Sequence, residues 1–338
     1  MSDFSEFISA LANYRSAVMM QLDRLQESGI RAPNEIMSLK DGINNNADLF
    51  EYVLKKAPYI FGGDKGIQLP IIRTPEEFDE SDLSQLMAAV KSAARDWTSL
   101  GNLEREQTYK PIINALKEYL PSGSNVLIPG AGLCRLAVEI ASNGFTAYAN
   151  EQAFVMLIMS QIALRRKKTF QIFPFLHQIS GLDSLDGALI HATFPEAKIK
   201  LNDDLDDNGI IEPLELLNEH RLNLLAGGFE AIQYARTQVY DSVVTCYFID
   251  VVADIPKAIN LIYNILRPGG YWINFGPMLL HRCEDSFFST MTLNDLKKVA
   301  IETGFQVIKE ERVETTYIEN PKSHLKSSYN CQFLVLQK

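Results

Sequence analysis

Residues 121–151 of this chain, PSGSNVLIPGAGLCRLAVEIASNGFTAYANE, decide the fold that the rest of the sequence extends. An apolar run at 125–128 predicts a short buried strand, and the glycine-containing segment 129–132 predicts a tight turn after it. Apolar residues then recur at helical spacing over 133–140, and a second apolar run covers 145–149. Strand, glycine turn, helix and strand in this order predict the βαβ unit of a nucleotide-binding fold.

Two features of this unit predict a ligand site at the turn. Glycines let the backbone approach a ligand closely, and the N-terminus of the following helix offers unpaired N–H groups. Glu151 follows the first glycine by about 20 residues, where a carboxylate can hold the hydroxyls of a ribose. Cys134 stands near the third glycine position of a dinucleotide fingerprint, which favours S-adenosylmethionine (SAM) over NAD, because SAM has no pyrophosphate. A βαβ unit without a ligand is the alternative.

The composition is that of an ordinary globular protein and argues against some classes of partner. Of the 338 residues, 46% are hydrophobic and 22% are charged, which is a typical balance. The net charge of −10 argues against nucleic acid as the main partner, because phosphate backbones require a basic surface. The longest apolar run, at 153–159, is far too short to cross a bilayer, so we expect no membrane association.

Cysteine usage and the N-terminal residues predict a soluble intracellular protein. The four cysteines show neither paired spacing nor a metal-ligand pattern, so we expect reduced thiols and no metal site. Residues 1–16 lack the basic start and apolar core of a secretory signal. The acidic stretch at 203–209 lacks the spacing of an EF-hand, and we expect a solvated loop there. We expect a cytoplasmic protein, with the nucleus as a second location.

The first 120 residues are predicted to form a helical region ahead of the βαβ unit. Helical spacing covers 1–27, 47–56, 81–97 and 103–119, whereas turn-forming residues predict loops at 28–45 and 58–75. Because no Ser/Gly-rich linker follows, we interpret 1–120 as a cap on a domain at 121–338. Such a cap can close over a site or join two copies into a homodimer.

Further strands and helices extend the βαβ unit into a larger sheet after an irregular insertion at about 165–220. We expect strands at 222–225, 242–249, 271–275, 305–313 and 331–336, and helices at 154–164, 255–266 and 293–303. The last two strands can pair antiparallel. The sequence therefore predicts an α/β fold with a Rossmann-like, mostly parallel seven-stranded sheet, that of the class I SAM-dependent methyltransferases.

Longer motifs occur in order along the chain. They are Arg95-Asp96-Trp97, Tyr109-x-Pro111-Ile112-Ile113, Pro129-Gly130-Ala131-Gly132-Leu133-x-Arg135-Leu136-Ala137, Pro174-x-x-His177-Gln178, Thr245-Cys246-x-Phe248-Ile249-Asp250 and Trp272-Ile273-Asn274-x-Gly276-Pro277. With these motifs the chain resembles the carnosine N-methyltransferase family over roughly residues 85–338. The resemblance implies SAM as the cofactor and methylation of an imidazole nitrogen in a small histidine-containing dipeptide. Carnosine, which would become anserine, is the first candidate.

The resemblance also implies which residues form the two parts of the site. The predicted cofactor residues, including the glycines beside them, are Arg95, Gly130, Gly132, Glu151, Gly228, Phe229 and Cys246. The predicted catalytic residues, which would hold the dipeptide, are Asp250, His281 and Tyr329.

Elementary chemistry supports a carboxylate in the acceptor site. A neutral imidazole has one nitrogen with a proton and one with a lone pair. A carboxylate such as Asp250 that accepts the N–H fixes the tautomer and leaves the other nitrogen free to attack a methyl carbon. The same carboxylate stabilises the imidazolium that forms. Because SAM carries a good leaving group, the protein has mainly to align the nucleophile and exclude water.

Alternatives are open for the residues and for the whole protein. Asp250 could cap a helix, His281 could be a loop histidine and Tyr329 could be a core residue. The acceptor could be another histidine-containing peptide or small molecule. The chain could also be a non-catalytic relative with weakened SAM binding, because Gly228 stands where the family has an aspartate and Cys134 replaces a glycine.

Overall fold

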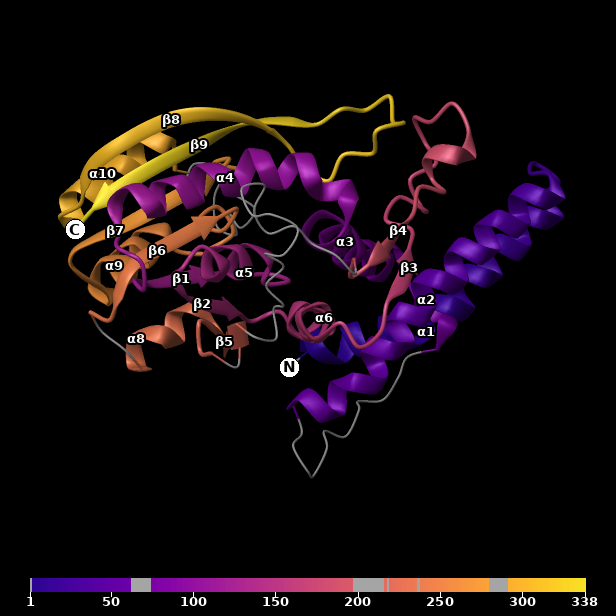
Figure 1. Ribbon diagram of the computed structural model, residues 1–338. Coiled ribbons are helices and arrows are strands. Elements are labelled where there is room, and N and C mark those ends of the chain that lie inside the picture. Colours follow the sequence, from indigo (N-terminus) through magenta and orange to yellow (C-terminus); the bar gives the residue numbers. More distant parts are fainter. Residues whose placement is uncertain (1, 62–73, 197–215, 218, 236–237, 280–290) are drawn as a thin grey trace, which may run out of the picture. The chain divides into compact units, whose positions relative to one another are not determined.

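The computed structural model describes residues 2–61, 74–196, 216–217, 219–235, 238–279 and 291–338, and the chain forms two compact units (Figure 1). The first unit contains Met1–Asn102, Phe154–Ala197 and Ile318–Ser327, and the second contains Leu103–Ala153, Lys198–Tyr317 and Ser328–Lys338. These borders differ from the sequence-based division at residue 120. Nearly all of the helix at 102–119 belongs with the second unit, and much of the insertion belongs with the first.

The first unit is mainly helical. Its helices are α1 (Ser2–Glu27), α2 (Pro33–Phe61), α3 (Glu80–Trp97) and α6 (Phe154–Arg165), with 3₁₀ turns at η2 (Pro75–Glu77), η3 (Ser99–Gly101) and η4 (Leu185–Gly187). Two short strands, β3 (Phe170–Ile172) and β4 (Ala192–Phe194), pair antiparallel. The helices α1 and α2 pack side by side (Figure 1). Among the described residues, none of the helices combines the length and the apolar character needed to span a membrane.

The helix α2 corrects one expectation from the sequence. Residues 28–45 are not a loop, because α2 begins at Pro33, whose fixed φ suits the first helical position. The Glu35 side chain accepts the N–H of Ala32 at 2.9 Å and caps this end. Farther along, the buried Asn46 amide accepts the N–H of Phe173 at 2.8 Å and donates to the carbonyl of Phe173 at 3.0 Å. The asparagine therefore serves a tertiary contact rather than a turn.

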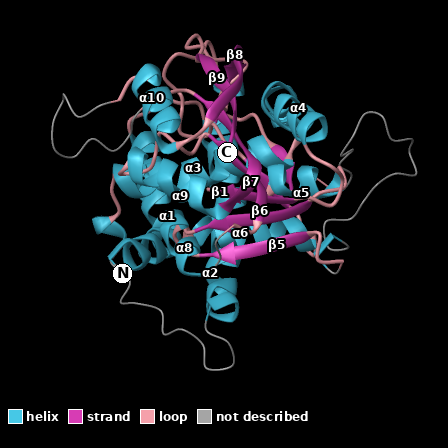
Figure 2. Ribbon diagram, turned by 90° about the vertical axis from the view of Figure 1, so that its left-hand side faces the viewer, coloured by secondary structure: helices cyan, strands magenta, loops and turns pink. Residues whose placement is uncertain are grey.

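The second unit is built on a seven-stranded sheet. Its strands are β1 (Asn125–Pro129), β2 (Thr146–Glu151), β5 (Leu222–Ala226), β6 (Tyr240–Cys246), β7 (Leu266–Gly276), β8 (Gln306–Thr316) and β9 (Ser328–Gln337). They lie in the order β5-β2-β1-β6-β7-β9-β8, which the labels of Figure 1 follow, and Figure 2 shows the strands in magenta from another side. The first five in this order are parallel, whereas β9 runs antiparallel to both β7 and β8. This confirms the predicted class I methyltransferase sheet.

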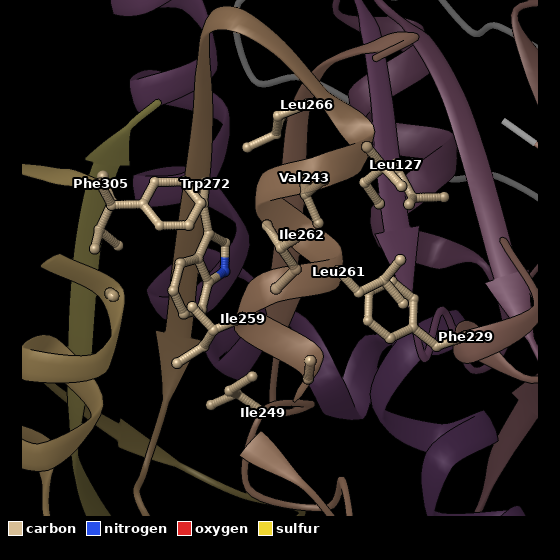
Figure 3. Close-up of a cluster of buried hydrophobic side chains, with 14 of the residues drawn as sticks. Leu127, Phe229, Val243, Ile249, Ile259, Leu261, Ile262, Leu266, Trp272 and Phe305 are labelled. Atoms are coloured by element: carbon tan, nitrogen blue, oxygen red, sulfur yellow. The ribbon is translucent and has the colours of Figure 1, made fainter. Parts of the chain in front are cut away.

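Apolar side chains hold helices against this sheet. The helices of the unit are α4 (Asn102–Tyr119), α5 (Arg135–Ser142), α8 (Ile232–Ala235), α9 (Ile255–Ile265) and α10 (Leu293–Thr303), with a 3₁₀ turn at η5 (Phe229–Ala231). Trp272 of β7 lies among residues of α9 and beside Phe305 (Figure 3). Its indole N–H donates to Thr245 Oγ1 at 2.8 Å, so the ring is buried without an unsatisfied donor.

The end of β6 differs from the expected strand. The strand stops at Cys246 rather than at Ile249, because Tyr247 has a positive φ of 50° that turns the chain. Phe248 and Ile249 lie beyond the strand, and their apolar side chains serve packing outside the strand ladder. Phe248 packs against the glycine turn at Gly130, and Ile249 is buried in the core with α9.

Candidate active site

The predicted site residues of the second unit gather at one edge of the sheet. The parallel strands β1, β2, β5 and β6 all end there, at residues 129, 151, 226 and 246. In open α/β sheets, ligands bind outside the carboxyl ends of the parallel strands. The residues that this edge brings together are Gly130, Gly132, Glu151, Gly228, Phe229, Cys246 and Asp250. Their individual roles stay predictions.

The two glycines of the turn after β1 are needed for different reasons. Both have a positive φ, of 64° at Gly130 and 55° at Gly132. A Cβ atom on Gly130 would collide with the ring of Phe248, so packing requires glycine there. A Cβ atom on Gly132 would meet no atom of the described residues within 4 Å. The backbone at Gly132 therefore borders open space into which a ligand can approach.

Glu151 connects this turn to the end of β2. Its Oε2 accepts the N–H of Gly132 at 2.8 Å, and its Oε1 accepts the N–H groups of Gln152 and Ala153 at 2.8 and 2.7 Å. The residue is 8% exposed. A carboxylate offers about four acceptor positions, so Glu151 keeps capacity for a ribose hydroxyl after these three bonds. The carboxylate and the open space at Gly132 fit a nucleoside such as that of SAM.

The turn after β5 packs against the turn after β6. Phe229 meets Phe248 edge to face, with the ring centroids 5.4 Å apart and an angle of 84° between the rings. Because Phe229 is also part of the buried core, its ring is fixed. A Cβ atom on Gly228 would lie 3.3 Å from Gln152 Oε1, which is close but does not collide. The backbone of Gly228 thus lies beside the residue that follows Glu151.

Cys134 does not line the open space at Gly132. It has a positive φ of 63°, which is uncommon for a residue with a side chain, and it precedes α5. Its N–H donates to the carbonyl of Ala131 at 2.8 Å, which closes the turn. The residue is 2% exposed, so its thiol adds almost no surface to the site. A side chain buried in this way does not account for the weakened SAM binding that the replacement of a glycine by Cys134 suggests.

Asp250 lies in the turn after β6 and is 3% exposed. The alternative that it caps the next helix is wrong, because α9 is capped by Asp254, whose Oδ1 accepts the N–H of Lys257 at 2.9 Å. Cys246, the last residue of β6, is half-buried. A buried carboxylate that is not a helix cap, close in sequence to the end of a parallel strand, is suited to bind a ligand.

The structure places two of the three remaining predicted residues, Tyr329 and Arg95, and does not describe the third, His281. Tyr329 is half-buried and lies near the start of β9, ahead of the buried run that begins at Cys331, so the alternative of a core residue is wrong. Arg95 belongs to the first compact unit, in the last turn of α3, and its Nε donates to Asp96 Oδ1 at 2.7 Å. His281 lies outside the described residues.

Three residues at the carboxyl edge are absent from the predicted site. Tyr247 lies between Cys246 and Phe248, while Thr315 and Tyr317 lie at the end of β8. The hydroxyl groups of Tyr247 and Thr315 are 2.9 Å apart although 68 residues separate them in the chain. No local sequence pattern could reveal this contact, because it depends on the antiparallel insertion of β9 between β7 and β8.

His177 of the fourth motif lies in the first unit, bound to a buried tyrosine. Its Nε2 lies 3.0 Å from the hydroxyl of Tyr14. Burial lowers the pKa of His177 to about 4, so the ring is neutral at pH 7. Within the residues that the structure describes, no group of three or more His, Cys, Asp or Glu side chains is arranged to hold a metal ion.

Comparisons with known proteins identify a family over most of the chain. A family model described as carnosine N-methyltransferase matches residues 73–338. The carnosine N-methyltransferase of Rattus norvegicus is 33% identical over 269 residues, which cover 76% of this chain and 64% of that protein. The corresponding protein of Dictyostelium discoideum is 34% identical over 75% of this chain and 54% of its own length. That of Schizosaccharomyces pombe is 29% identical over 93% of this chain and 86% of its own length.

The chain thus spans less than two thirds of the rat and Dictyostelium relatives that it matches. The match with the family model nevertheless covers both the glycine turn and the turn that carries Asp250, and it continues to the last residue of β9. The chain therefore belongs to the carnosine N-methyltransferase family.

Proposed function

We propose that this chain is a SAM-dependent N-methyltransferase that methylates an imidazole nitrogen of a histidine-containing dipeptide. Carnosine is the first candidate, with anserine as the product. The observation that carries the proposal is the buried Asp250 carboxylate, which lies in the turn after β6 and does not cap α9. Membership of the carnosine N-methyltransferase family supplies the acceptor.

Glu151 and the glycine turn form the cofactor side in this proposal. The Glu151 carboxylate holds a ribose hydroxyl while its backbone bonds keep the turn in place. Gly132 lets the ligand approach the N-terminus of α5, and Phe229 closes the side toward the core. When bound, SAM supplies an activated methyl group on a positively charged sulfur.

Asp250 orients the acceptor on the other side. Its carboxylate accepts the N–H of one imidazole nitrogen, so the second nitrogen presents its lone pair. As that nitrogen gains a methyl group, positive charge develops on the ring, and Asp250 stabilises it at close range. The proton held at Asp250 can then remain on the product imidazolium or pass to water. Tyr329 borders the acceptor from the β9 side.

The proposal is tested by incubating the purified protein with SAM and carnosine. We expect a product that is heavier by one methylene and that NMR identifies as methylated on a single imidazole nitrogen. Carnosine in which the imidazole is already methylated at that nitrogen serves as the negative control and should not react. Binding of SAM without any methylation of carnosine would contradict the assignment of the acceptor.

The same purified protein can test the two alternatives, a different methyl acceptor and a non-catalytic relative. Turnover of another histidine-containing peptide, but not of carnosine, would favour a different acceptor. Calorimetric titration with SAM and with its demethylated product tests the non-catalytic relative, which Gly228 motivates because it offers no side chain to the cofactor. Absence of binding at high ligand concentration would support that alternative.

Pairing of two copies through α1 and α2 is also part of the proposal. Large apolar side chains on these helices and in the segment between them are exposed at Met20, Ile30 and Met37. Light scattering coupled to gel filtration measures the mass in solution. A monomer at micromolar concentration would contradict this part of the proposal and leave the chemistry untouched.

A further inference from the structure

Tyr247 occupies a strained position between two predicted site residues. It follows Cys246 directly and has a φ of 50°, a left-handed conformation that bulky residues rarely adopt. Its N–H donates to the carbonyl of Phe275 at 2.8 Å. A Cβ atom on Gly276 would lie 3.3 Å from the Tyr247 backbone, so β7 packs closely against this turn. Such backbone strain persists only where the surroundings enforce it, and it concentrates at functional sites.

The hydroxyl of Tyr247 is held by two residues of the β8–β9 pair. It lies 2.9 Å from Thr315 Oγ1 and 3.4 Å from Cys331 Sγ, and these two atoms are 3.4 Å apart. Each of the three groups carries one hydrogen, so a closed ring in which each donates once and accepts once satisfies all of them. Burial raises the pKa of Tyr247, and the hydroxyl therefore keeps its proton.

Ring contacts connect Tyr247 with Tyr329, which is predicted to hold the methyl acceptor. The rings of Tyr247 and Tyr317 have centroids 5.0 Å apart, and Tyr317 meets Tyr329 edge to face at 6.0 Å. Thr315, which binds the Tyr247 hydroxyl, also lies directly opposite Tyr329 in the β8–β9 ladder. Tyr329 is therefore linked to Tyr247 in two ways, through the ring of Tyr317 and through Thr315, its partner in the β8–β9 ladder.

We propose that Tyr247 is a positioning residue for the methyl acceptor. By fastening the ends of β8 and β9 to the turn that carries Asp250, its hydroxyl fixes the place of Tyr329 relative to that carboxylate. This inference rests on the proposed function, because it assigns Tyr247 a role toward the acceptor of the same site. Tyr247 itself acts through Thr315 and Tyr317 rather than on the reacting atoms.

The alternative is that Tyr247 only fills space between Phe275 and Tyr317. A packing role needs the ring and not the hydroxyl, so Tyr247→Phe separates the two explanations. This variant keeps the ring contacts, and it leaves Thr315 and Cys331 bonded to each other. If only packing matters, the variant behaves like the wild type toward the acceptor.

The experiment measures methyl transfer at saturating SAM with carnosine as the varied acceptor. In Tyr247→Phe we expect KM for carnosine to rise about fivefold to tenfold, which corresponds to one lost hydrogen bond that positions a contact. The Kd for SAM should change by less than about twofold. Thr315→Val removes the same bond at nearly the same volume and should give the same rise. The double variant should lose little more than either single variant.

Tyr271→Phe is the matched control. Tyr271 lies in β7 of the same sheet, at the end of the β7–β9 ladder away from the carboxyl edge, and its oxygen accepts a hydrogen bond from Gln337 Nε2 at 3.1 Å. Tyr271→Phe removes a tyrosine hydroxyl from the same sheet and leaves the residues at the carboxyl edge unchanged. An equal rise of KM in Tyr271→Phe, or an unchanged KM in Tyr247→Phe, would overturn the positioning role. A parallel loss of SAM affinity in Tyr247→Phe would also overturn it.

Hydrogen exchange provides a readout that does not depend on turnover. Amide exchange at 312–316 and 328–331 should be faster in Tyr247→Phe and in Thr315→Val than in the wild type, and unchanged in Tyr271→Phe. Unaltered exchange would show that the hydroxyl anchors nothing. A wild type that methylates no histidine-containing acceptor would refute the proposed function instead. The positioning role would then fall with it, even if the exchange data show the anchor.

Discussion

The carboxylate of Glu151 and the backbone N–H of Gly132 lie 2.8 Å apart and join the end of β2 to the glycine turn after β1. Two further backbone N–H groups bind the same carboxylate, so the turn is ordered before any ligand arrives. The proposed cofactor side of the site is therefore preorganised, and a ligand there would not have to order the loop that receives it.

Glu151→Gln should weaken SAM binding by at least about tenfold, since charge-assisted hydrogen bonds are the stronger ones. An amide has one accepting oxygen, and its NH₂ group would face a backbone donor in place of the second oxygen. Calorimetry with SAM provides the measurement. Glu230→Gln, on an exposed side chain that pairs with Lys257, is the control and should bind SAM normally. Equal affinity in the two variants would exclude Glu151 from the cofactor site.

Gly130→Ala and Gly132→Ala should fail in different ways. Both variants carry the strain of a positive φ, but only the methyl group at Gly130 collides with Phe248. We expect Gly130→Ala to lose about 2–4 kcal/mol of unfolding free energy and Gly132→Ala about 1 kcal/mol. Gly132→Ala should instead lose SAM affinity, because its methyl group enters the open space at the turn. Denaturant unfolding and calorimetry distinguish these effects, and similar results for both would be evidence against the assignment.

Asp250→Ala and Asp254→Ala form a matched pair four residues apart. Asp250→Ala should reduce methyl transfer by a factor of about 100 or more while SAM binding persists, because the tautomer of the acceptor is no longer fixed. Asp254→Ala removes the cap of α9 and should cost about 1 kcal/mol of stability with turnover largely retained. Near-normal turnover of Asp250→Ala would make the proposed role of this carboxylate wrong.

Stability should depend on pH through His177 of the first unit. Its pKa is lowered from 6.5 to about 4 by burial, so between these values the unfolded chain binds a proton that the folded chain does not. The free energy of unfolding therefore falls as the pH decreases through this window, by about 3 kcal/mol in total. Urea unfolding at pH 7.5 and at pH 4.5 should show a larger loss for the wild type than for His177→Gln, in which this titration is absent. Equal losses would show that His177 does not contribute.

The sequence predicts the elements around Glu151 better than the turn around Asp250, and the reason is chain distance. The strand, glycine turn, helix and acid of residues 125–151 form a local pattern, and the structure has all four where they are expected. The sequence predicts the end of β6 less well, at Ile249 instead of Cys246. Phe248 continues an apolar run, but it is apolar because it packs against Gly130 and not because it pairs in the sheet.

Tertiary contacts override local preferences at the other differences. Residues 28–45 contain turn-forming residues but lie largely within α2, where Asn46, just beyond them, binds the main chain of Phe173 across 127 residues. The ring of hydrogen bonds at Tyr247 joins positions 68 and 84 residues apart. A pattern within a short window carries no information about such pairs.

The position of β9 between β7 and β8 implies an order of assembly. Within the sheet, β8 pairs only with β9, so β8 cannot join before β9 has docked on β7. The unit from β1 through α5 to β2 depends on contacts between near neighbours, which form early because little chain entropy is lost. The nucleotide-binding half can thus be complete while the β8–β9 pair is still detached. On the proposed function, a partly folded molecule of this kind would bind SAM and have no acceptor site.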